Sequence, residues 1–215
     1  LLQEKHFLHT LREVCTANGI LLFFDEVISG FRVGFNGAAE LFDITPDIVT
    51  YGKIIGGGLP VGAYGAKAEI MAQISPDGPV YQAGTLSGNP VAMAAGIAQL
   101  TECATPGFYE ALEAKTIKFV TTINTFAQTK NYDFELVTIG SIFWISFDGK
   151  RSIHRADEIN PDMSKFSRLH WSLLNHGIYI GPSGYEVGFI SQAHSEEVLE
   201  TAAELFCVSL EEVYN

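Results

Sequence analysis

A lysine and an aspartate in this 215-residue sequence have the surroundings of catalytic groups. Lys53 lies between an apolar segment and the glycine run at 56–58, and Asp25 ends the apolar run 20–24. A lysine amine in such a place can attack an aldehyde, and a carboxylate can hold a proton on a pyridine nitrogen so that the ring withdraws electrons. Together they predict a pyridoxal phosphate site, with Lys53 forming the Schiff base and Asp25 facing the ring nitrogen.

Each residue also has a plainer interpretation. Asp25 could cap a neighbouring helix, and Lys53 could be a surface lysine whose methylene groups cover apolar residues. The pair favours catalysis because ligands bind at the carboxyl ends of parallel strands, where Asp25 is expected. Desolvation would also lower the pKa of Lys53 and leave a neutral, nucleophilic amine.

A second segment, residues 84–90, has the composition of a phosphate site. Its sequence is Gly-Thr-Leu-Ser-Gly-Asn-Pro, so a hydroxyl and several free amides are expected just before a helix start. The alternative is a polar loop with an ordinary helix cap. The glycines at 56–58 follow the lysine and no GxxxxGK[ST] pattern exists, which excludes a P-loop.

The elements around these residues indicate an α/β fold. Apolar spacing predicts a helix over residues 7–18 that ends at Gly19. The run 20–25 lacks alternation, so we expect a strand buried on both faces of a mainly parallel sheet. Further elements expected in this part are strands at 48–51 and 61–64 and a small-residue helix from Pro90 to about Leu100, with Asn89 as its N-cap.

The pattern of residue types changes near residue 106, which predicts a domain boundary there. Residues 1–106 would be part of a larger cofactor-binding domain, and residues 107–215 a smaller α+β domain. The second domain should contain helices at 108–128, 161–175 and from Ser195, one or two strands within 134–147, and short strands at 178–180 and 187–191.

Composition narrows the classes of partner. The chain has 13 basic and 25 acidic residues and a net charge of −12, which argues against nucleic acid or an anionic membrane as partner. No run of about twenty apolar residues is present. The cysteines form no CxxC pair and the histidines have no third ligand at metal spacing, so neither a disulfide framework nor a metal site is expected. We therefore expect a protein that acts on a small molecule, either in the cytoplasm or in an organelle whose transit peptide is not present in this sequence.

Four segments together resemble the glutamate-1-semialdehyde aminomutase family of fold-type I pyridoxal phosphate enzymes, which is related to the class III aminotransferases. They are residues 25–32, 50–64 and 79–96, and residues 177–183 together with Glu186, Gly188, Phe189, Ala193 and His194. The resemblance covers nearly the whole chain, and the chain looks like the carboxyl-terminal half of such an enzyme. One mild departure is Ser29, where a threonine is usual.

The resemblance implies roles for individual residues. Lys53 would be the Schiff-base lysine and proton shuttle, Asp25 the partner of the pyridinium, and Val27 an apolar contact to the ring. Gly84 and Thr85 would bind the cofactor phosphate of the partner subunit in a homodimer whose active site is shared across the interface.

Two further residues have competing interpretations. Glu186 matches an active-site glutamate, although it could be a surface acid at a strand end. Arg32 could bind a substrate carboxylate, but we favour a structural ion pair, since the family motif gives it no direct role.

The implied reaction is the isomerisation of glutamate 1-semialdehyde to 5-aminolevulinate in tetrapyrrole synthesis, by intramolecular amino transfer that starts from pyridoxamine phosphate. The alternative enzyme is a class III aminotransferase that uses an external amino donor. A third hypothesis is a non-catalytic half-protein that binds partners. The chain as given is expected to be incomplete for activity.

Overall fold

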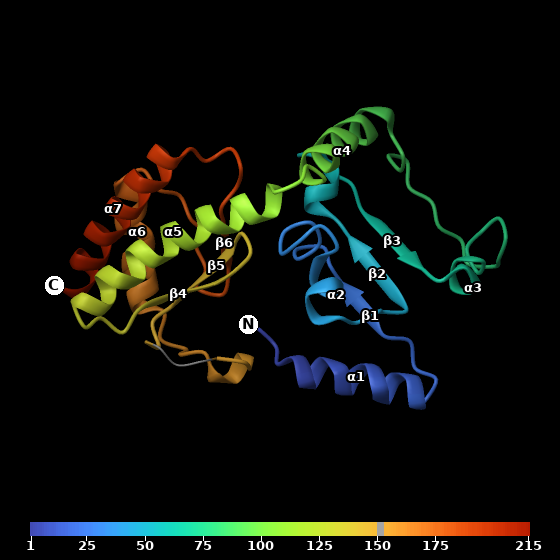
Figure 1. Ribbon diagram of the computed structural model, residues 1–215, viewed down its shortest axis with the longest axis horizontal. Helices are drawn as coiled ribbons and strands as arrows, with labels where there is room; N and C mark the ends of the chain where they lie inside the picture. Colours follow the sequence, from blue (N-terminus) through green and yellow to red (C-terminus); the bar gives the residue numbers. More distant parts are fainter. Residues whose placement is uncertain (150–152) are drawn as a thin grey trace. The chain divides into compact units, whose positions relative to one another are not determined.

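The computed structural model describes residues 1–149 and 153–215, and this part of the chain forms two compact units (Figure 1). The first unit is Gln3–Tyr109, and the second is Glu110–Asn215 together with Leu1–Leu2. No helix within the described ranges is long and apolar enough to cross a membrane.

Helix α1 (Lys5–Ala17) opens the first unit and ends as predicted at Gly19. Gly19 has a φ of 65°, its amide bonds Thr16 O, and the amide of Ile20 bonds Cys15 O over 2.9 Å. This double bond pattern is the Schellman motif, which satisfies the last carbonyls of a helix. It also uses the amide of Ile20, so strand β1 (Phe23–Asp25) begins three residues later than the sequence suggested.

The first unit contains a three-stranded mixed sheet in the order β1-β2-β3. β2 (Ile48–Tyr51) pairs with β1 in parallel and with β3 (Ala63–Ala66) antiparallel. β1 lies at the edge of this sheet, and Phe23 is 50% exposed. The prediction of burial on both faces is therefore wrong for β1 within this chain, because Phe23 and Asp25 are exposed on one face and Phe24 is only half-buried on the other.

Three short helices and one long helix complete the first unit: α2 (Gly37–Phe42), the 3-10 helix η1 (Lys53–Gly56), α3 (Ala68–Met71) and α4 (Pro90–Cys103). The predicted cap of α4 is confirmed, since Asn89 Oδ1 accepts from the amide of Ala92 over 2.9 Å.

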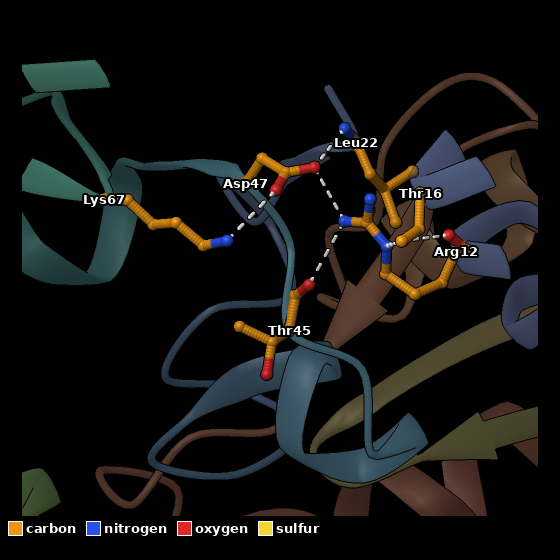
Figure 2. A network of polar contacts seen from close by, with 6 residues as sticks. All are labelled: Arg12, Thr16, Leu22, Thr45, Asp47 and Lys67. Carbon is orange, nitrogen blue, oxygen red and sulfur yellow. Dashed lines mark hydrogen bonds and ion pairs between the residues drawn. The ribbon is translucent and has the colours of Figure 1, made fainter. Parts of the chain in front are cut away.

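A polar network joins the end of α1 to both strands of the parallel pair (Figure 2). Asp47 lies just before β2, and its Oδ2 accepts from Arg12 Nη1 and from the amide of Leu22, each over 2.7 Å. Lys67, which directly follows β3, approaches Asp47 Oδ1 with its Nζ at 3.8 Å. These donors, the Leu22 amide foremost, lower the pKa of Asp47. The network fixes where β1 and β2 start relative to each other.

Helix α4 packs tightly against the turn that contains Lys53. A methyl group added at Gly57 would overlap the carbonyl oxygen of Ala95, and one added at Gly96 would overlap the carbonyl oxygen of Ile55. The backbones of α4 and of the turn can approach so closely because a glycine without a side chain lies against a carbonyl oxygen at each of the two contacts. The small residues of α4 thus allow close packing, and this contact holds η1 in place from one side.

The second unit packs three long helices with an antiparallel sheet in the order β4-β5-β6 (Figure 1). Its elements are α5 (Phe108–Thr129, of which the first two residues belong to the first unit), β4 (Glu135–Ile139), β5 (Ile142–Ser146), the 3-10 helix η2 (Ala156–Glu158), α6 (Ser164–Asn175), β6 (Val187–Phe189) and α7 (Glu196–Tyr214). The core residues Ile123, Leu169, Leu173 and Leu210 are all 0% exposed. Burial of each such side chain favours folding by about 2 kcal/mol.

Two predicted elements of the second unit differ in the structure. Residues 178–180 do not form a strand, because the amide of Ile178 bonds Leu173 O over 2.8 Å and Gly177 has a φ of 85°, which is again a Schellman cap. Helix α6 starts at Ser164 rather than at 161, and just before this start Asp162 Oδ1 accepts from the amide of Ser164.

Candidate active site

Asp25 is exposed at the carboxyl end of β1, next to the middle strand of the sheet. It pairs with Thr50 in the parallel register. Its Oδ1 accepts from the amide of Val27 over 3.0 Å and from Thr50 Oγ1 over 3.4 Å. Both donors hold the same oxygen, so the carboxylate has a fixed direction while its second oxygen stays available for a ligand.

Lys53 begins η1, three residues after Thr50 along the chain. It has a φ of 49°, in the left-handed region where glycine is the usual residue. A lysine kept at a position that glycine would occupy with less strain points to a function of its side chain. The predicted desolvation of Lys53 is wrong for this chain, because its side chain is exposed and the apolar neighbour Val27 packs against Gly52 instead.

Val27 and Gly52 bring the Asp25 and Lys53 segments together. A methyl group added at the buried Gly52 would lie 3.1 Å from Val27 Cγ1, closer than an ordinary van der Waals contact. Val27, whose amide donates to Asp25, therefore touches Gly52, the residue before Lys53. The structure thus gathers Asp25, Val27 and Lys53 at one end of the β1–β2 pair.

Gly84 and residues 86–89 line a cleft of about 620 Å³ in the first unit. Gly84 faces this cleft together with residues from η1, from the segment 60–63 and from α4. Tyr51 of β2 and Phe31 of the loop after β1 also line it. Burial raises the pKa of Tyr51, and the charge of Glu26 raises it further. The cleft walls are mostly apolar, which suits the face of an aromatic ligand or an apolar surface.

Thr85 lies in the exposed turn that follows Gly84. The turn uses part of its own backbone, since the amide of Ser87 bonds Gly84 O over 3.0 Å and that of Asn89 bonds Leu86 O over 3.2 Å. The sequence had suggested several free amides here, and these two are not free. Thr85 itself is not among the residues that line the cleft.

Glu186 is an exposed residue directly before β6, in the second unit. Its amide bonds Ser183 O over 3.0 Å, and its carboxylate lies against Gly181, where a methyl group would overlap Oε2. β6 presses on β5 because Gly188 faces the Phe143 ring, so the strand next to Glu186 is closely packed. Its role in catalysis stays a prediction.

Arg32 is half-buried in the loop after β1. Desolvation lowers the pKa of its guanidinium. The structural ion pair expected from the sequence stays a prediction.

Sequence reasoning missed two residues that shape this site. Thr50 bonds Asp25, and Glu26 is only 1% exposed and binds the loop that carries Phe31. Strand alternation could have identified Glu26, because it lies between Asp25 and Val27 and should point to the opposite side. Thr50 could be found only with the strand register.

Known proteins are similar to this chain in sequence and in fold. The sequence matches the family described as aminotransferase class-III over residues 1–203. It is 48% identical over 204 residues to the glutamate-1-semialdehyde 2,1-aminomutase of Leptospira biflexa serovar Patoc, an alignment that covers 94% of this chain and 48% of that protein. The chain therefore spans about half the length of the curated relatives it matches.

Two solved structures are similar over the whole chain. An omega-transaminase from Sphaerobacter thermophilus has a TM-score of 0.89 and 32% identity, over 99% of this chain and 49% of that one. A transaminase solved with PLP bound has a TM-score of 0.86 and 32% identity, over 99% and 49% of the two chains. The architecture is accordingly that of fold-type I transaminases.

Proposed function

Because the chain belongs to the class-III aminotransferase family, we propose that it supplies half of a pyridoxal phosphate-dependent aminomutase. The enzyme would isomerise glutamate 1-semialdehyde to 5-aminolevulinate by intramolecular amino transfer, a step of tetrapyrrole synthesis. The single observation that carries the proposal is the β1–β2 register, which puts the fixed carboxylate of Asp25 beside Thr50, three residues before Lys53.

The chain's own residues fit pyridoxal phosphate. One oxygen of Asp25 is held by two donors, which leaves the other to meet a protonated ring nitrogen. The exposed amine of Lys53 is open to an aldehyde, and Val27 offers an apolar surface at the same strand end. These are the groups that a pyridine aldehyde requires.

Each residue then has a chemical task. Pyridoxal phosphate, when bound, withdraws electrons from a substrate carbon. Asp25 would hold a proton on the ring nitrogen, Val27 would offer an apolar contact to the ring, and Lys53 Nζ would hold the cofactor and serve as the proton shuttle. Glu186 would act on the substrate.

The proposal includes a homodimer with shared sites. Gly84 and Thr85 would bind the phosphate of the partner's cofactor. Support comes from the exposed apolar side chains beside this turn, Tyr81 at 82% and Leu86 at 67%, since such residues favour contact with another protein surface. We place the enzyme in the cytoplasm, as its three cysteines are unpaired.

An aminotransferase with an external amino donor is the second candidate, and the 32% identity to an omega-transaminase favours it. The full-length protein separates the two when it is loaded with pyridoxamine phosphate and given glutamate 1-semialdehyde alone. Repeated turnover to 5-aminolevulinate without an amino donor supports the mutase. A single turnover that resumes only after a donor amine is added would identify the aminotransferase.

A further inference from the structure

Glu26 is a buried acid to which the proposed chemistry gives no task. It is 1% exposed, between Asp25 and Val27. A carboxylate at such a position loses its hydration and is stable only when hydrogen bonds replace the water. What binds Glu26 therefore shows what it holds in place.

The donors to Glu26 all come from one segment that follows it in the chain. Ser29 Oγ donates to Oε2, and so does the amide of Ala38 over 3.0 Å. The amide of Ala39 donates to Oε1 over 2.8 Å. Gly37 has a φ of 68°, and a methyl group there would lie 2.6 Å from Oε2, so the backbone wraps closely around the carboxylate. The segment 27–39 thus folds around this one side chain.

The backbone of Glu26 is fixed at the same time. Its amide bonds Thr50 O over 3.0 Å, and its carbonyl accepts from the amide of Gly30 over 2.9 Å. Glu26 is buried while Asp25 is exposed, as expected when successive side chains of a strand point to opposite sides. Because the amide of Val27 bonds Asp25 Oδ1, anchorage of residue 26 from the buried side also limits the movement of Asp25 and Val27.

Segment 27–39 reaches the cleft through Phe31. This residue has a φ of 58°, which a non-glycine residue rarely adopts. Its carbonyl accepts from Tyr109 Oη over 3.2 Å, and its ring centroid lies 5.6 Å from that of Tyr51, which also lines the cleft. Phe31 is thus held by contacts at its backbone and at its ring.

We propose that Glu26 is a positioning residue of the active site. Its buried carboxylate holds segment 27–39 in the conformation that presents Asp25 and Val27 at the end of β1 and Phe31 at the cleft. The inference rests on the proposed function for what these residues meet there. Glu26 would act through this segment and would contact neither the cofactor nor the substrate.

The test uses the full-length protein with the variants Glu26→Gln, Ser29→Ala and Ser29→Thr. Glutamine keeps the size of Glu26 but puts an amide donor against groups that donate. Ser29→Ala removes one donor and is mild enough to fold if Glu26→Gln does not, whereas Ser29→Thr keeps the hydroxyl. Glu40→Gln is the matched control, since Glu40 is an exposed acid on α2.

Two measurements are compared. Amide hydrogen exchange of the cofactor-free protein should accelerate about tenfold in residues 26–39 of Glu26→Gln, with α4 unchanged. The dissociation constant of pyridoxal phosphate should rise about tenfold and kcat should fall, while the melting temperature of the loaded protein changes little. Ser29→Ala should raise the exchange rate in residues 26–39 and the dissociation constant of pyridoxal phosphate by about threefold each. Ser29→Thr and Glu40→Gln should match wild type in both quantities.

Three outcomes would overturn the proposal. One is unchanged exchange in residues 26–39, and another is an equal rise of exchange over the whole chain with normal cofactor affinity and kcat. Equal effects of Ser29→Thr and Ser29→Ala would show that the hydroxyl bond is irrelevant. Wild-type protein that binds no pyridoxal phosphate would instead refute the proposed function and the role of Glu26 toward the cofactor, while the exchange data would still decide the anchoring.

Discussion

Asp25 lies opposite Thr50 in the parallel register of β1 and β2, and Thr50 Oγ1 donates to Asp25 Oδ1 over 3.4 Å. This bond ties the proposed acid to the strand that leads into Lys53. The direction of the Asp25 carboxylate and the start of η1 are therefore set by the same pair of strands. A change in the strand register would displace both chemical groups.

We expect Asp25→Asn in the full-length enzyme to retain bound cofactor but to lose activity on the order of 10²-fold, because an amide cannot stabilise the charge on the ring nitrogen. Thr50→Val keeps the branched shape and loses only the donor, so a loss of a few-fold is expected. Steady-state kcat with cofactor occupancy checks both. Full activity of Asp25→Asn would show that the carboxylate is structural.

Borohydride reduction of the aldehyde-form holoenzyme should attach the cofactor to Lys53. The variant Lys53→Ala should reduce turnover by about 10³-fold without unfolding the protein. Peptide mass mapping identifies the labelled lysine. Lys67 is the matched control, because it is 59% exposed and pairs with Asp47 at 3.8 Å. Lys67→Ala should keep both label and activity, and a label on Lys67 would contradict the assignment.

Predictions that depend on neighbours along the chain were the more accurate ones. Asn89 and Pro90 start a helix through a cap that spans only a few residues, and Gly19 ends one in the same way. The strand at 178–180 was predicted because Ile-Tyr-Ile favours a strand. It does not form, since the cap of α6 uses the amide of Ile178.

The parts of the site that could not be predicted depend on contacts between distant segments. Glu26 meets Ala39, and Thr50 meets Asp25, only after the loop and the register have formed. The exposure of Lys53 likewise depends on where Val27 packs. Residue types indicated the chemistry of Asp25 and Lys53, whereas the groups that orient Asp25 required the fold.

The Asp47 network predicts a dependence of stability on pH. The pKa of Asp47 is lower in the fold, so its stabilisation is fully present above the unfolded pKa of about 3.9 and is lost as the pH falls through the folded value. Asp47→Asn should lower the free energy of unfolding by about 2 kcal/mol at pH 7, and this difference should shrink in acid. Chemical unfolding between neutral and acid pH checks it. Asp43→Asn, at an exposed position, is the control and should cost little.

The isolated 215-residue chain should associate in solution. Only three apolar side chains described in the first unit are buried, Ile44, Ala92 and Cys103, while Ile20 and Leu21 are 54% and 55% exposed. Large exposed apolar surfaces are rarely stable on a monomer. Size-exclusion chromatography with light scattering should show oligomers, and a monodisperse monomer would favour a non-catalytic half-protein.

The last prediction concerns the shared site. If Thr85 binds the phosphate of the partner's cofactor, full-length Lys53→Ala and Thr85→Glu chains should each be poor alone but active as a mixed dimer. One site would then combine an intact Lys53 with an intact Thr85, and the other would carry both lesions, so about half of the wild-type activity per dimer is expected. The glutamate is chosen because its charge repels phosphate.

Two affinity tags allow the mixed dimer to be purified and assayed against each parent. A double-mutant chain paired with wild type is the control, since a shared site would then leave one lesion in each of its two sites. If Thr85 serves its own chain, the outcomes exchange: the mixed dimer stays as poor as its parents and the control pair is active. That exchange would refute the shared site while leaving the role of Lys53 intact.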